Sequence, residues 1–90
     1  MSEFAQCVDD CRLCAELFRL GRDVEAALMM VDVFEQSQDL FSQTPHAVQQ
    51  QWAQLLMSMF AAQEAQDWLG LADSMEYELI DLLEAGQSHR

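Results

Sequence analysis

The sequence predicts an all-α protein, an antiparallel up-down bundle of four helices that occupies residues 1–90 as a single domain. Apolar side chains recur at the three- and four-residue spacing of a helix along most of the chain. Glycine occurs 3 times and proline once, which is too rare for the turns of a β-sandwich or barrel. Hydrophobic residues make up 51% of the chain and charged residues 22%, a composition that excludes a disordered chain and supports one core.

Capping signals divide the chain into helices near residues 3–20, 23–42, 45–65 and 67–85. Pro45 follows a capping threonine and suits a first helical position, where its missing N–H is not needed. Gly21 and Gly86 are expected to end helices, because glycine readily adopts the left-handed conformation found there. The third boundary is the weakest, so a bundle of three helices, with the last two continuous, is the alternative. The N-cap candidates are Ser2, Asp23, Thr44 and Asp67.

The first helix carries two apolar stripes. The stripe expected in the core comprises Phe4, Cys7, Val8, Cys11, Cys14, Ala15 and Phe18. The second stripe lies on nearly the opposite side and comprises Leu13, Leu17 and Leu20. A four-helix bundle needs one stripe per helix, so the second stripe predicts a partner, either a second copy or another protein. The alternative is that this stripe only covers the ends of the bundle.

The second helix is apolar over more than half of its circumference. The core stripe expected here comprises Ala26, Met29, Met30, Val33, Phe34, Leu40 and Phe41. Val24, Leu28 and Val31 lie beyond that stripe and add to the surplus of apolar surface. The polar strip is narrow and acidic, and it comprises Glu25, Asp32, Glu35 and Asp39.

The third and fourth helices each have one clear apolar face. These faces comprise Val48, Trp52, Leu55, Leu56, Met59 and Ala62 in the third helix, and Trp68, Leu71, Ala72, Met75, Leu79, Leu82 and Leu83 in the fourth. Met57 and Phe60 lie toward the rim of the third helix, beside a glutamine-rich face, where we expect a partner to bind. Glu76 lies at the edge of the fourth apolar face and needs a partner there. Arg12 or Arg19 would form an inter-helix ion pair with it, and a bound protein is the alternative.

The chain carries 16 acidic residues, 4 arginines and no lysine, which gives a net charge of -12. This charge excludes ordinary nucleic-acid binding and disfavours anionic membrane surfaces. Residues 44–63 carry no charged side chain, so two acidic regions flank one neutral helix. The acidic faces serve either solubility or the attraction of a basic partner. No nucleophile triad, glycine-rich phosphate loop or Glu-x-x-His pair is present, so we do not expect an enzyme.

Cys7, Cys11 and Cys14 recur at helical spacing and are interpreted as small core residues, because free cysteine packs as a hydrophobe. Three cysteines on one helix argue against a disulfide framework and for a reducing compartment. With no secretory signal recognisable, we expect a cytoplasmic location. The stretch Cys7–Glu16 resembles part of the cysteine-rich helical bundles that store copper(I), which implies thiolate metal binding as an alternative. No other metal or cofactor is expected.

In size, acidity and helical organisation, the whole chain resembles the small export chaperones of bacterial flagellar and type III secretion systems. This resemblance implies an adaptor that binds an amphipathic, aggregation-prone segment of a bacterial protein. The stretch Ala65–Leu79 is similar to a Leu-Ala-Asp-x-x-Glu-Tyr-Glu-Leu segment of small helical bacterial proteins. The chain also resembles the small acidic immunity proteins, which implies inhibition of a basic toxin or nuclease as the alternative function.

We therefore expect a protein–protein interaction module whose partner is a basic or amphipathic helix, with a homodimer as a further form of association. Apolar side chains would supply affinity, and acidic side chains would steer the partner and set its register. The residues expected to bind the partner are Leu13, Leu17, Leu20, Val24, Leu28, Asp32, Glu35, Asp39, Met57, Phe60 and Glu76.

Overall fold

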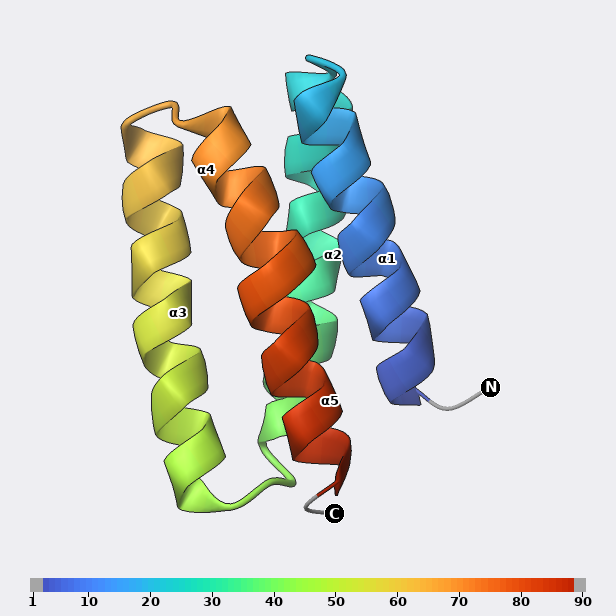
Figure 1. The fold of residues 1–90 in the computed structure, drawn as a ribbon, viewed down its shortest axis with the longest axis vertical. Helices are drawn as coiled ribbons and strands as arrows, with labels where there is room; N and C mark the ends of the chain where they lie inside the picture. Colours follow the sequence, from blue (N-terminus) through green and yellow to red (C-terminus); the bar gives the residue numbers. More distant parts are fainter. Residues whose placement is uncertain (1–2, 89–90) are drawn as a thin grey trace.

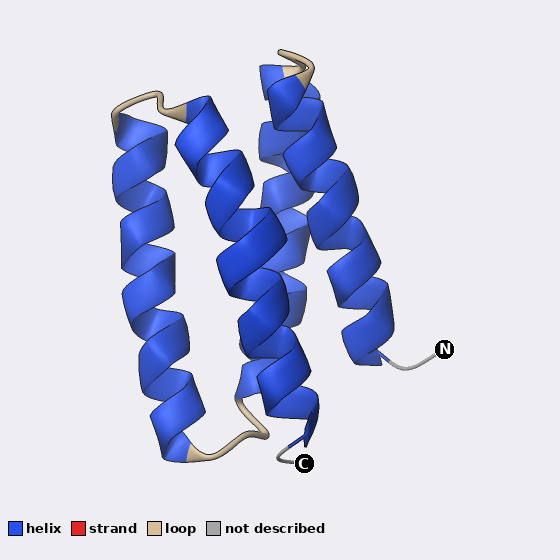
Figure 2. Cartoon of the chain, in the orientation of Figure 1, coloured by secondary structure: helices blue, strands red, loops and turns tan. Residues whose placement is uncertain are grey.

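The computed structural model describes residues 3–88, which form helices joined by short turns (Figure 1, Figure 2). The predicted all-α helical bundle is confirmed, and the third and fourth helices are separate. Ser2, a predicted cap, lies outside the described residues. The elements are α1 (Glu3–Arg19), α2 (Asp23–Phe41), α3 (His46–Glu64), α4 (Trp68–Asp73), the π-helix η1 (Ser74–Leu79) and α5 (Ile80–Ser88).

The three connections lie at alternate ends of the molecule (Figure 1). The turns after α1 and after α3 lie at the upper end in this view, and the connection from α2 to α3 lies at the lower end. The last three elements follow one another directly, and we call them the C-terminal run. This run packs against both α1 and α3, and α1 packs against α2. Contact between α2 and α3 is much sparser, and this leaves room for a surface groove between them.

The core contains most of the residues of the apolar stripes that the sequence predicts. Five predicted core residues are only partly buried at its edge: Met29, Phe34, Leu56, Ala62 and Trp68. All seven residues of the main stripe of α1 are buried. The small side chains of the cysteines, alanines and Ser37 let α1 approach α2 closely. At this distance a thiol or hydroxyl can form a hydrogen bond across the interface. The Cys14 thiol donates to the carbonyl of Ala26 at 3.3 Å, and Cys7 Sγ lies 3.5 Å from the buried hydroxyl of Ser37. The cysteines thus serve as small core residues, as predicted.

Two predicted boundary signals are confirmed. Gly21 has a φ of 76°, the left-handed conformation that ends α1. Asp67 is the N-cap of α4, and its carboxylate accepts a hydrogen bond of 3.0 Å from the backbone N–H of Gly70. Gln66, just before that cap, also has a positive φ of 57°. These sharp turns allow connections of only a few residues.

The predicted caps of α2 and α3 are wrong. Arg22 holds the N-cap position of α2, so Asp23 is the first helical residue and its side chain makes no capping bond. Pro45 holds the N-cap position of α3, one residue later than expected. The hydroxyl of Thr44 turns back and donates to the carbonyl of Phe41 at 2.6 Å, so it closes α2 instead of capping α3.

The expected end of the last helix at Gly86 is also wrong, because α5 continues to Ser88. A Cβ on Gly86 would lie 3.3 Å from Thr44 Cγ2 and 3.5 Å from the rings of Phe4 and Phe41. The glycine therefore allows α5 to pack closely against its neighbours, a role that depends on tertiary contacts. Within residues 3–88, no helix combines the length and apolarity that a membrane span requires.

Candidate partner-binding groove

An open groove of about 710 Å³ runs between α2 and α3. Its walls are mostly apolar, although the chain has a large excess of acidic residues. Several of these apolar side chains are far from buried: Val24 is 76% exposed, Leu28 68% and Phe60 47%. We call it the α2/α3 groove, and it is lined by Asp23, Val24, Ala27, Leu28, Met30, Val31, Phe34, Glu35, Phe60 and Gln63.

The α2 wall of the groove follows a helical repeat of its own. Five of its six apolar members lie at positions i, i+3, i+4, i+7 and i+10, and they comprise Val24, Ala27, Leu28, Val31 and Phe34. This stripe is distinct from the buried stripe of α2, which comprises Ala26, Met30, Val33, Ser37, Leu40 and Phe41. The sixth apolar member, Met30, belongs to the buried stripe and borders the groove. A helix with two apolar stripes, one of which faces solvent, has the pattern of a helix that docks another helix.

Aromatic rings join the two walls and hold the groove in shape. The ring of Phe34 packs edge-on against Phe60, with the centroids 5.7 Å apart, and against Trp52 at 6.0 Å. Trp52 also packs against Phe41 at 5.1 Å and donates from its indole N–H to the Gln38 amide oxygen at 2.9 Å. Of these rings, Phe34 and Phe60 line the groove. Because aromatic side chains have few rotamers, the contacts of Phe34 with Phe60 and Trp52 hold this part of the groove in a preformed shape.

The charged side chains that line the groove are acidic, and both lie on α2. Asp23 lines one end, and Glu35 lines the other. A recess of about 440 Å³, lined by Phe34, Glu35, Gln38 and Asp39, continues the groove along α2. The opposite wall is neutral, since residues 44–63 contain no charged side chain.

The arginines that the structure describes pair with carboxylates that do not line the groove. Arg12 lies 3.7 Å from Asp9, and Arg22 lies 3.5 Å from Glu25. Arg19 lies 2.7 Å from Asp73 and 2.9 Å from Glu76. Within residues 3–88, the carboxylates of the groove therefore have no arginine partner. They are available to a cation on a bound molecule.

The structure brings together four of the residues that we predicted to bind a partner. Val24, Leu28, Glu35 and Phe60 line the α2/α3 groove. Asp39 lies in the recess that continues it. Sequence reasoning left out Ala27, Val31 and Phe34 as binding residues, although the i, i+3, i+7, i+10 spacing from Val24 could have indicated them.

The other predicted binding residues lie elsewhere. Leu13 on α1 and Leu20 in the turn after it are exposed, whereas Leu17 is partly buried against the core. Met57 on α3 is 73% exposed, and Asp32 on α2 is also exposed, but neither lines the groove. The surplus apolar surface of α1 and α2 is therefore not one continuous site.

Glu76 forms the predicted inter-helix ion pair, with Arg19 as its partner. The guanidinium of Arg19 bonds both Asp73 and Glu76, and it links α1 to the C-terminal run. A hydrogen bond from Tyr77, and then the one from Arg19, lower the pKa of Glu76. The ion pair lies where the π-helix η1 begins, and Phe18 stacks on Trp68 nearby with ring centroids 5.7 Å apart. This arrangement gives Glu76 a structural role.

The three cysteines are fully buried. Burial raises the pKa of Cys14 to about 12, and the hydrogen bond with Cys7, together with burial, raises the pKa of Cys11. The same hydrogen bond lowers the pKa of Cys7. Within residues 3–88, no three histidine, cysteine or acidic side chains are grouped so that they could hold a metal ion. The geometry therefore gives no support to the thiolate alternative.

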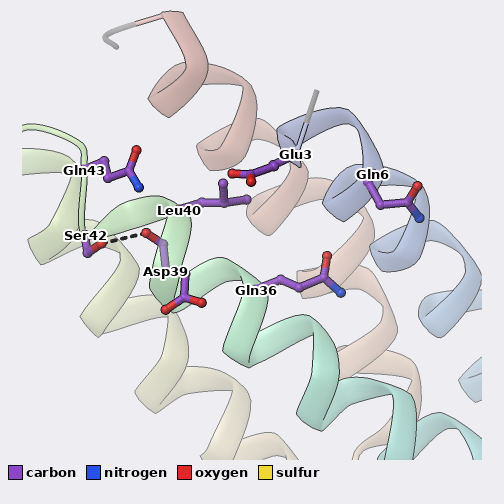
Figure 3. Close-up of a pocket in the computed structure, with 7 residues that line it drawn as sticks. All are labelled: Glu3, Gln6, Gln36, Asp39, Leu40, Ser42 and Gln43. Atoms are coloured by element: carbon purple, nitrogen blue, oxygen red, sulfur yellow. Dashed lines mark hydrogen bonds between the residues drawn. The ribbon is translucent and has the colours of Figure 1, made fainter. Parts of the chain in front are cut away.

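A second recess, of about 620 Å³, lies beside the start of α1 and the end of α2 (Figure 3). Its lining comes from α1, α2 and the residues that follow α2, and comprises Glu3, Gln6, Gln36, Asp39, Leu40, Ser42 and Gln43. Gln36 already donates to Asp10 at 3.0 Å, as does Gln6 at 3.1 Å. The lining of this recess is polar and apolar in similar measure, whereas that of the α2/α3 groove is almost entirely apolar, so the recess is the poorer site for an apolar helix face.

Comparisons with protein families, with curated proteins and with solved structures gave no match to this chain. The function is therefore argued from the α2/α3 groove itself.

Proposed function

We propose that this protein is a non-enzymatic interaction module that holds an amphipathic helix of a partner protein in the α2/α3 groove, in the manner of a bacterial export chaperone. The observation that carries the proposal is the second apolar stripe of α2, which repeats at helical spacing and lines a preformed groove. A partner helix would bury this stripe with its own apolar face. The exposed valine, leucine and phenylalanine side chains would provide the affinity.

Charge favours a basic partner over a second copy of the chain. Each copy carries a net charge of -12, so two copies would repel one another. The same charge attracts and orients a segment rich in lysine or arginine. An export chaperone that keeps such a segment soluble would combine an apolar groove with acidic surroundings.

A matched pair of variants tests the site. The probe is a fluorescein-labelled synthetic helix of about 20 residues, alanine-based, with leucines at i, i+3, i+4 and i+7 and lysines outside this stripe. Leu28→Asp places a charge in the groove, and Met57→Asp places the same charge at a comparably exposed position outside it. We expect fluorescence polarisation to show at least about tenfold weaker binding for Leu28→Asp, which is about 1.4 kcal/mol, and no change for Met57→Asp.

Equal affinities for both variants would overturn the assignment of the groove. A scrambled peptide of the same composition controls for charge alone, because it keeps the lysines but has no apolar stripe. If the scrambled peptide binds as well as the ordered one, the protein recognises charge and not an amphipathic helix.

The acidic strip of α2 favours a second candidate function, inhibition of a basic toxin or nuclease. Asp32 is exposed there, close in sequence to Glu35 and Asp39. Such an inhibitor would bind through carboxylates, so its affinity would fall steeply with salt, whereas binding through apolar side chains would persist. Neutralising Asp32 and Asp39 to asparagine would weaken the inhibitor complex, and Leu28→Asp would have little effect on it.

A further inference from the structure

The ends of the α2/α3 groove are acidic, and its middle is not. Asp23 is the first residue of α2, and Glu35 follows it by twelve positions, so the two are about 18 Å apart along the helix axis. Asp39 follows Asp23 by sixteen positions, or about 24 Å. The α2 side chains that line the groove between Asp23 and Glu35 are all apolar.

Within residues 3–88, these carboxylates form no ion pair with an arginine. The ion pairs of the described arginines use Asp9, Glu25, Asp73 and Glu76 and none of the carboxylates at the groove. The Oδ1 atom of Asp23 is enclosed and makes no hydrogen bond. An enclosed carboxylate oxygen without a donor is unfavourable. Asp23 as a whole is only partly buried, so a cation that approaches the exposed side of its carboxylate would offset part of that cost.

We infer that the groove selects its ligand by length, taking an amphipathic helix whose apolar stripe is flanked by basic residues twelve to sixteen positions apart. This inference rests on the proposed function and specifies its partner. A helix laid along α2 has the same rise per residue, so residues at that spacing lie level with Asp23 at one end and with Glu35 or Asp39 at the other. Such residues point about 120° or 160° apart around the helix axis, so they flank the apolar stripe on its two edges, and long lysine or arginine side chains are needed to reach the carboxylates. The apolar residues between them would face the second stripe of α2.

A second copy of the chain does not meet this requirement. Its basic side chains are Arg12, Arg19, Arg22 and Arg90, and no two of them lie twelve to sixteen positions apart. Arg19 is also held by its two carboxylate partners. The ligand is therefore a helix from a different protein.

The test uses four peptides of one length and composition, which share the leucine stripe of the probe above. Each carries two lysines, four, eight, twelve or sixteen positions apart, with glutamine at the vacated positions. Each lysine that meets a carboxylate of the groove should raise the affinity about two- to fivefold, the range that exposed ion pairs provide. We therefore expect the peptides with the twelve- and sixteen-residue spacings to bind more tightly than the other two peptides. This preference should shrink when sodium chloride is raised from about 0.15 M to 0.5 M.

Variants assign each end of the groove. Glu35→Gln should weaken the twelve-spaced peptide selectively, and Asp39→Asn should weaken the sixteen-spaced peptide. Asp23→Asn should weaken both by a similar factor. Asp81→Asn, at an exposed position on α5, removes the same charge away from the groove and should change neither.

The outcomes separate this inference from the proposed function. Equal binding of all four peptides, together with loss of binding in Leu28→Asp, would overturn selection by length and leave the groove as the binding site. Weakening by Asp81→Asn as strong as that by Glu35→Gln would overturn the inference too, because net charge alone would then act. Failure of all four peptides to bind would overturn both proposals.

Discussion

The substitution Gly70→Ala tests the N-cap of α4, because the effect of the added methyl group on stability depends on Asp67. The Asp67 carboxylate accepts the N–H of Gly70 at 3.0 Å. A Cβ on Gly70 would lie 2.7 Å from the carboxyl carbon of Asp67, and even closer to Oδ2. In Gly70→Ala the carboxylate must therefore rotate away, and the cap is lost.

Two opposing effects set the magnitude. Replacing glycine by alanine in a helix stabilises the fold by up to about 1 kcal/mol. Losing an aspartate cap costs about 1 kcal/mol, within a range of about 0.5–2 kcal/mol. Gly70→Ala alone should therefore leave the free energy of unfolding nearly unchanged. In an Asp67→Ala background there is no cap to lose, so the same substitution should stabilise the protein by up to about 1 kcal/mol.

Urea denaturation of the four proteins in this double-mutant cycle measures the difference directly. A coupling of about 1 kcal/mol corresponds to about 4–8 °C in Tm for a domain of this size. If Gly70→Ala stabilises the natural chain and the Asp67→Ala variant equally, the alanine methyl does not displace the carboxylate. The described cap geometry would then be refuted.

Three further outcomes are expected. The pKa of Glu76 is lowered in the folded protein, so its ion pair stabilises the fold above the ordinary carboxyl pKa of 4.5. This stabilisation is lost as the pH falls through the pKa of the folded state. The Tm of Glu76→Gln should therefore fall less than the Tm of the natural chain between about pH 5 and 3. The three buried thiols should not react with Ellman's reagent at neutral pH until the protein is unfolded in guanidinium, and rapid reaction of any one would contradict their placement in the core. Gly86→Leu should lower the free energy of unfolding by about 1–3 kcal/mol, since it overfills the contact with Thr44 and Phe41, whereas unchanged stability would show that α5 does not pack there.

The sequence alone determined the fold class, the approximate positions of the four helices and most of the core. These follow from the spacing of apolar residues along a single helix, which is a local property of the chain. The same is true of Gly21 and Asp67, because a left-handed turn and an N-cap involve residues only a few positions apart. The pairing of Glu76 with an arginine was also predictable, since a carboxylate beside an apolar face requires a partner.

Only the tertiary structure decided which surplus apolar residues form a site. Leu13 and Val24 have the same surplus character in the sequence, yet only Val24 lines the groove, because α3 packs against the C-terminal run and leaves one side of α2 open. Gly86 looked like a helix end because the sequence does not show that Thr44 and Phe41 lie against it. Periodicity shows which face of a helix is apolar, but the neighbour of that face depends on how all the helices pack together.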